Sequence, residues 1–149
     1  MTGSIEMLNV LGAVVAVVIH VLVIAVFVAR LGGKPAIEHW LGLLTIGTIV
    51  PLGYLFVTGV TLNRPALYLI QVGLMIAYLI VELLLDYVYR VDFRCDRRIV
   101  IPYIILFYAG TGGMIGVAGL AGQAWLCVAV SSFLIMMALS IVQRRITGQ

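Results

Sequence analysis

Charged side chains are scarce in this sequence, and their scarcity excludes most soluble folds. Only 10% of the 149 residues are Asp, Glu, Lys or Arg, whereas 64% are hydrophobic. A soluble domain has about 25% charged and about 45–50% apolar residues. Such an excess of apolar residues is expected when side chains face lipid as well as a protein core. The composition therefore predicts an integral membrane protein.

Cysteine is almost absent, and the few reactive side chains form no familiar motif. Cys95 and Cys127 have neither Cys-x-x-Cys nor zinc-site spacing. His20 and His39 lack the His-x-x-x-His spacing of a metal site. The glycine-rich stretch 110–119 lacks the Gly-Lys-Ser/Thr of a phosphate-binding loop. We therefore expect no metal and no cofactor.

Five apolar segments each approach the length of about 20 residues that crosses a bilayer core. Short connections that contain glycine, proline or charged residues separate them. The chain is therefore predicted to form one membrane domain over residues 1–149, an all-α bundle of five transmembrane helices. The first segment is too long for the core of a signal peptide, and no cleavage motif follows it, so we expect it to be retained. The predicted spans are residues 8–29, 37–61, 66–89, 99–117 and 124–142.

The basic residues flank these spans and predict the topology. With five spans, only Arg64 lies on one side of the membrane. The residues on the other side are Arg30, Lys34, Arg90, Arg94, Arg97, Arg98, Arg144 and Arg145. Cytoplasmic loops are enriched in Lys and Arg, so we expect an outside amino terminus and a cytoplasmic carboxyl terminus. A prokaryotic inner membrane is the predicted location. The basic residues do not gather on an amphipathic surface, so the net charge of +3 does not predict nucleic-acid binding.

The third span carries two carboxylates in an otherwise apolar helix. At about 100° per residue, five polar or semi-polar side chains fall in one stripe. The stripe consists of Gln71, Tyr78, Glu82, Asp86 and Tyr89. A charge that faces lipid costs at least about 2.5–3.5 kcal/mol. We therefore expect the stripe to face protein or water, with Leu79 and Leu83 nearer the lipid.

Depth separates the two carboxylates and predicts different partners for them. Asp86 can pair with Arg90, four residues further along the helix, or with an arginine of the following loop whose side chain reaches back toward it. Glu82 lies about 12 Å inside the boundary that Arg90 marks, and His20 lies about 15 Å inside the boundary that Arg30 marks. This matched depth predicts a hydrogen bond or an ion pair between Glu82 and His20. Two interpretations stay open: a polar pair that fixes helix register, with Glu82 ionised or protonated, or a proton-relay, substrate or ion site.

Small residues and one proline predict how the helices pack. Gly112 and Gly116 form a Gly-x-x-x-Gly pattern, which is typical of close packing between helices of one chain or of two copies. Pro51 lies in the middle of the second span and is predicted to kink it and to free a carbonyl near Gly47. Broken helices of this kind line binding sites in some transporters.

These features predict a non-enzymatic multi-pass protein with a buried Glu/His site. It would serve as a small transporter or as an accessory subunit of a larger membrane complex. The expected partners are the lipid bilayer and either a second copy of the chain or such a complex. The alternative is an intramembrane enzyme that uses Glu82, Asp86 and His20, although no catalytic motif supports it. A transporter requires a polar cavity that reaches from the midplane to one surface.

Overall fold

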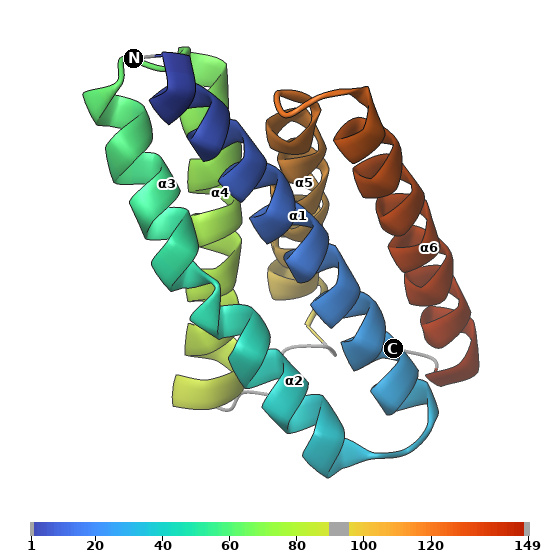
Figure 1. Ribbon diagram of the computed structural model, residues 1–149. Coiled ribbons are helices and arrows are strands. Elements are labelled where there is room, and N and C mark those ends of the chain that lie inside the picture. The colour runs from blue at the N-terminus through green and yellow to red at the C-terminus, as the bar shows by residue number, and fades with distance from the viewer. Residues whose placement is uncertain (1, 90–95, 148–149) are drawn as a thin grey trace.

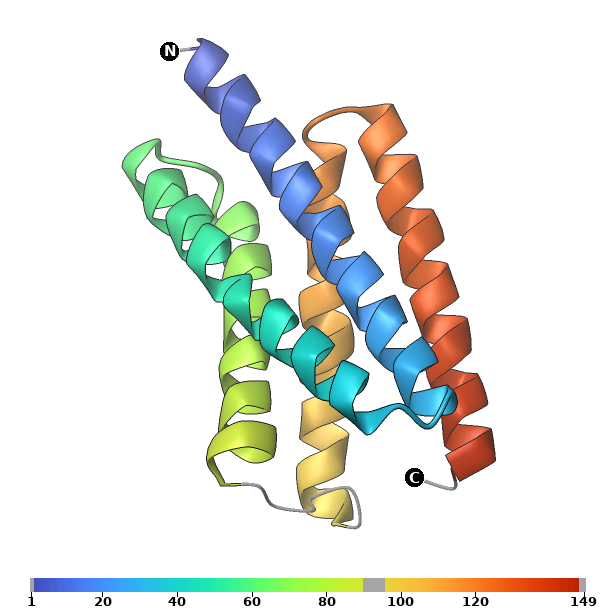
Figure 2. The same ribbon diagram turned by 60° about the horizontal axis from the view of Figure 1, so that its bottom comes forward.

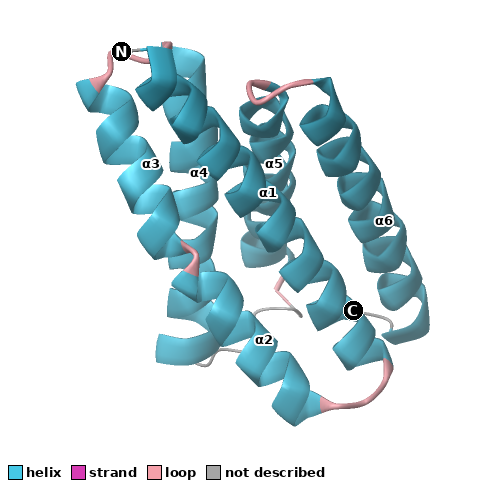
Figure 3. Ribbon diagram, in the orientation of Figure 1, coloured by secondary structure: helices cyan, strands magenta, loops and turns pink. Residues whose placement is uncertain are grey.

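The computed structural model describes residues 2–89 and 96–147, and these ranges are helical apart from short turns (Figures 1 and 3). No strand occurs within them. The segments are α1 (Thr2–Leu31), α2 (Pro35–Gly47), α3 (Ile49–Thr61), α4 (Ala66–Glu82), the π-helical η1 (Leu83–Val88), α5 (Arg97–Gly119) and α6 (Gln123–Thr147).

Five helices are long and apolar enough to cross a membrane, which confirms the predicted all-helical fold with five apolar helices. The second of these helices consists of α2 and α3, and the third consists of α4 and η1. Their bounds are Gly3–Leu31, Pro35–Thr61, Ala66–Val88, Arg97–Gly119 and Gln123–Ile146.

The chain runs up and down, so that each of the five long apolar helices is antiparallel to the next one in the sequence (Figure 1). The end of α1, the start of α2, the start of α5 and the end of α6 therefore lie at the same end of the bundle (Figures 1 and 2). We call this the basic end, because its described residues include Arg30, Lys34, Arg97, Arg98, Arg144 and Arg145. Arg64, in the turn between α3 and α4, lies at the opposite end.

The second apolar helix is interrupted at Thr48, three residues before Pro51 (Figure 3). Proline has no backbone N–H, so it cannot donate to the carbonyl of the residue four positions earlier, which is Gly47. Two threonine hydroxyls bond to nearby carbonyls instead. The Thr48 hydroxyl donates to Thr45 O at 2.6 Å, and the Thr45 hydroxyl donates to Leu41 O at 2.8 Å. Both threonine hydroxyls therefore have carbonyl acceptors beside the interruption.

The most extensive helix packing joins α4 to α5, and glycines of α5 make it close. A Cβ added at Gly110 would lie 3.2 Å from Met75 Cα, and one added at Gly113 would lie 3.4 Å from Gln71 Cα. Gly116, three residues further on, also faces Gln71. Small residues with a spacing of three therefore let the two backbones approach each other.

Gly112 does not belong to this interface. A Cβ at Gly112 would instead lie 3.8 Å from the ring of Phe133 on α6. The prediction that Gly112 and Gly116 form one packing surface is therefore wrong. The stretch holds several glycines, and spacing alone does not determine which of them face the same neighbour.

Candidate functional site

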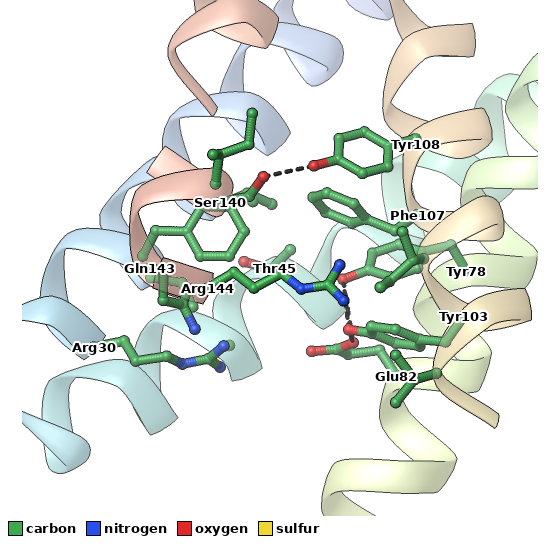
Figure 4. Close-up of a pocket in the computed structure, with 17 residues that line it drawn as sticks. Arg30, Thr45, Tyr78, Glu82, Tyr103, Phe107, Tyr108, Ser140, Gln143 and Arg144 are labelled. Carbon is green, nitrogen blue, oxygen red and sulfur yellow. Dashed lines mark hydrogen bonds between the residues drawn. The ribbon is translucent and has the colours of Figure 1, made fainter. Parts of the chain in front are cut away.

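A partly open cavity of about 250 Å³ lies in the half of the bundle nearer the basic end (Figure 4). Residues from α1, α2, α4, α5 and α6 line it. Most of the lining is apolar, and Glu82 is the one carboxylate among the described lining residues. Arg30 and Arg144 supply its positive charges, and Arg144 is exposed. The cavity thus combines apolar walls with a few charged groups, as small-ligand sites do.

Two tyrosine hydroxyls hold the carboxylate of Glu82. The Tyr78 hydroxyl, one helical turn earlier on α4, donates to Glu82 Oε2 at 3.1 Å. The Tyr103 hydroxyl, from the first turns of α5, donates to the same oxygen. Within the described ranges, Glu82 Oε1 has no hydrogen-bond donor, and that side of the carboxylate points into the cavity (Figure 4). One oxygen is therefore fixed by the protein and the other faces the space where a ligand would lie.

An aromatic wall continues from these tyrosines. Tyr78 and Phe107 have ring centroids 5.2 Å apart, and Phe107 and Tyr108 have centroids 5.0 Å apart. Phe27 of α1 meets Phe107 edge to face, at 6.2 Å. Edge-to-face packing of this kind stabilises aromatic pairs beyond the burial of their area. The wall is consequently a rigid apolar surface beside the carboxylate.

The two arginines of the cavity have different surroundings. Arg30 donates through Nε to Glu38 Oε1 of α2 at 2.6 Å, and its Nη2 lies 2.5 Å from the same oxygen. The guanidinium of Arg144 extends from α6 into the cavity (Figure 4). No ion pair joins Arg144 to Glu82 in the described part of the chain. The charge of Arg30 is therefore compensated by Glu38, whereas Arg144 and Glu82 face the same space without an ion pair between them in the described part of the chain.

The polar stripe that we predicted on the third span does not act as a unit. Tyr78 and Glu82 line the cavity. Gln71 packs instead against Gly113 and Gly116 of α5. Asp86 is not among the residues that line the cavity. Its predicted ion-pair partner, Arg90, lies outside the described residues.

His20 is fully buried and binds elsewhere, so the predicted Glu82–His20 pair is wrong. Its Nε2 donates to Thr111 O of α5 at 3.0 Å, because a carbonyl oxygen can only accept. Its Nδ1 lies 2.9 Å from the Ser132 hydroxyl of α6. Both ring nitrogens are thus used to join α1 to α5 and α6. Glu82 instead bonds to Tyr103, eight residues before Thr111 on α5, so counting residues from the boundary arginines did not bring the two side chains to the same level.

The prediction that Leu79 lies near the lipid is also wrong, because Leu79 is 0% exposed. The packing of α4 explains this, since α4 contacts α2, α3 and α5 and so is covered on several sides. Beyond Glu82 the stripe fails for a second reason. Residues Leu83–Val88 form a π-helix, whose wider turn changes the angle per residue. An ideal α-helical projection therefore misplaces Asp86 and Tyr89.

Three residues of this region were not identified from the sequence as functional candidates. Tyr103 and Arg144 lie in other helices than Glu82. The sequence around each of them does not indicate that Tyr103, Arg144 and Glu82 line the same cavity. Ser132 had a detectable signal: a hydroxyl side chain in an apolar helix commonly hydrogen-bonds to a neighbouring helix. Its partner could not be identified without the helix arrangement.

The five apolar helices indicate an integral membrane protein, and a partly open cavity lies between its helices. No family model matches the chain, and no similar curated protein or solved structure was found. Function must therefore be argued from the geometry of the site itself.

Proposed function

We propose that this protein is a non-enzymatic membrane bundle that binds a small solute in the cavity beside Glu82, as a transporter does. The observation that carries the proposal is the position of Glu82 in the wall of a partly open cavity rather than in a dry interior. Ionisable groups at membrane depth are costly, and for that reason they commonly mark substrate or ion pathways.

The lining of the cavity supports solute binding. Ligand sites are mostly apolar, with a small number of placed polar groups that fix orientation. Here Glu82, Tyr103 and Arg144 are the placed groups, and aliphatic and aromatic side chains form the rest. A volume of about 250 Å³ is below the range of about 300–1,000 Å³ that is typical of larger ligands, so the solute should be small.

The enzyme alternative has less support. It requires Glu82, Asp86 and His20 to meet at one cleft, but of these three only Glu82 lines the cavity. An accessory subunit of a membrane complex would share the same bundle. The difference from a transporter lies in the access to the cavity: an accessory subunit needs access from only one side of the membrane.

Cysteine labelling tests both the cavity and its access. Ser140 lines the cavity on α6, and Ala138, two residues earlier, is exposed on the opposite side of the same helix. Ser140→Cys and Ala138→Cys would be made in a chain whose Cys95 and Cys127 are replaced by Ser. Each would be treated in vesicles with a small, membrane-impermeant, negatively charged thiol reagent added to one side.

We expect Ser140→Cys to react much faster than Ala138→Cys from the side of the basic end. If Ser140→Cys also reacts, more slowly, when the reagent is added on the opposite side, the result would support a transporter. Alternating access exposes the binding site of a transporter to both faces of the membrane. Reaction from the basic end alone would favour the accessory subunit. Equal rates for the two variants would contradict a water-filled cavity, and with it the proposed function.

A further inference from the structure

We infer that the cavity takes a small amphipathic zwitterion, with its ammonium group at Glu82 and its acidic group at Arg144. This inference rests on the proposed function, which states only that a small solute binds there. It adds the chemical class of the ligand, and it follows from the charges and the apolar walls of the cavity.

Glu82 is arranged to accept an ammonium group. Its Oε2 already accepts from two tyrosines, whereas Oε1 faces the cavity without a donor from the described residues. An ammonium is a pure donor, and a hydrogen bond between two charged groups is shorter and stronger than one between neutral groups. The aromatic rings of Tyr78 and Tyr103 lie next to this position and would also attract a cation.

Arg144 is arranged to bind an acidic group. Its guanidinium extends from α6 into the cavity, and Arg30, which also lines the cavity, is already paired with Glu38. A guanidinium matches the geometry of a carboxylate or a phosphate. Lys34, Arg97 and Arg98 add positive charge at the same end of the bundle. This field attracts an anionic group to the entrance and repels a simple cation.

Only a zwitterion matches both charges of the cavity. A simple cation would leave Arg144 unmatched, and a simple anion would leave Glu82 unmatched. A charged group beside apolar walls is more stable with an oppositely charged partner than without one. The remaining lining is apolar and includes Val23, Ile104 and Ile141, so it suits a short hydrocarbon group on the ligand.

Two sources can supply this chemistry. One is a free apolar α-amino acid, and the other is the ethanolamine headgroup of a phospholipid. Both carry an ammonium and an anionic group a few bonds apart. The experiment therefore uses leucine as one probe and dihexanoyl phosphatidylethanolamine, a short-chain lipid, as the other.

Binding would be measured by calorimetry on the full chain in detergent. The controls for leucine are N-acetyl-leucine, which lacks the ammonium, and leucine methyl ester, which lacks the acid. We expect at least one zwitterionic probe to bind, with an affinity about tenfold or more above that of its blocked analogues, because each loses a charge-assisted contact. N-acylated and neutral-ester analogues serve the same purpose for the lipid probe.

Three variants assign the two ends of the ligand. Glu82→Gln should bind the N-acetyl compound and the zwitterion equally, and Arg144→Gln should bind the methyl ester and the zwitterion equally. Arg145→Gln is the matched control, because Arg145 is adjacent and exposed but does not line the cavity. It should leave all affinities unchanged. The comparison of probes on the unmodified chain stands even if a variant fails to fold.

The outcomes separate this inference from the proposed function. Binding of leucine alone identifies a free solute, binding of the lipid alone identifies a headgroup, and binding of both supports the shared chemistry. Blocked analogues that bind as tightly as the zwitterions would overturn the inference. So would absence of binding by both zwitterions while Ser140→Cys is labelled, and in that case the proposed function stands. If Ser140→Cys is not labelled either, both fail.

Discussion

Glu82 and His20 show two ways of accommodating a polar side chain in an apolar bundle. His20 lies in a dry interior with both ring nitrogens occupied by other helices. Glu82 lies at a cavity wall with one oxygen held by tyrosines. The first arrangement joins helices together, and the second leaves a charged group available for chemistry. Residue type and depth alone do not distinguish them, because the difference is made by residues of other helices.

The separate environments of these two residues predict additive effects on stability. His20→Ala should lower the free energy of unfolding by about 1–3 kcal/mol, since it leaves buried polar partners unsatisfied. Glu82→Gln keeps an acceptor for the two tyrosines and should have a smaller effect. Because the two residues share no hydrogen-bond partner, the double variant should equal the sum within about 0.3–0.5 kcal/mol.

Thermal or denaturant unfolding in detergent measures these free energies. It would be applied to the two single variants and to the double variant. Glu82→Asp serves as a control for the volume of the side chain while keeping its charge. A coupling energy above about 1 kcal/mol would mean that the two sites interact and would contradict the separation seen here.

At the scale of helices, two local departures from a regular α-helix position the site. The interruption at Thr48 separates α2 from α3, and α2 contributes Gly42 and Thr45 to the cavity lining. The π-helix η1 begins directly after Glu82. Its Tyr87 donates to His39 O at 3.1 Å and so ties the end of this helix to α2. π-helical turns often occur at functional sites, which agrees with the position of η1.

The glycines of α5 give a prediction at the same scale. Ala at Gly110 would bring its Cβ to 3.2 Å from Met75 Cα and 3.3 Å from Leu74 O, so backbone atoms would have to move. Ala at Gly112 would meet only the Phe133 ring, at 3.8 Å. Both changes improve helix propensity equally, so their difference reports packing. We expect Gly110→Ala to be less stable than Gly112→Ala by about 1–3 kcal/mol, the usual cost of overpacking.

Gly112→Ala is the matched control for this test, because it changes the same residue type on the same helix. Unfolding of both variants under identical detergent conditions gives the difference. If Gly112→Ala proved the less stable of the two, the interface between α4 and α5 would have to involve the Gly-x-x-x-Gly pair after all.

At the scale of the molecule, the sequence predicted what is local to each segment. The five apolar helices followed from hydropathy, because each must cover its own length with apolar side chains whatever its neighbours are. The lateral arrangement did not follow. Leu79 was placed near lipid because only one helix was considered, whereas in the bundle it is covered by neighbouring helices. The cavity likewise depends on Tyr103 and Arg144, whose approach to Glu82 is a property of the whole arrangement.

The last prediction concerns the orientation of the bundle in the membrane. The structure gathers Arg30, Arg97 and Arg144 at one end and puts Arg64 at the other. Basic residues next to transmembrane segments are retained on the cytoplasmic side. We therefore expect the basic end, which is the end nearer the cavity, to face the cytoplasm.

Single cysteines in a chain that lacks Cys95 and Cys127 test this orientation in bacterial cells and vesicles. Lys34→Cys, in the exposed turn between α1 and α2, should react with an impermeant maleimide in inside-out vesicles but not in intact cells. Thr61→Cys, exposed at the opposite end, should react in intact cells. Restoring Cys95 alone should give the pattern of Lys34→Cys, because an even number of predicted spans separates the two positions. The reverse pattern at all three positions would mean that the basic end faces away from the cytoplasm. Labelling of Lys34→Cys and Cys95 from different sides would contradict the five-span topology itself.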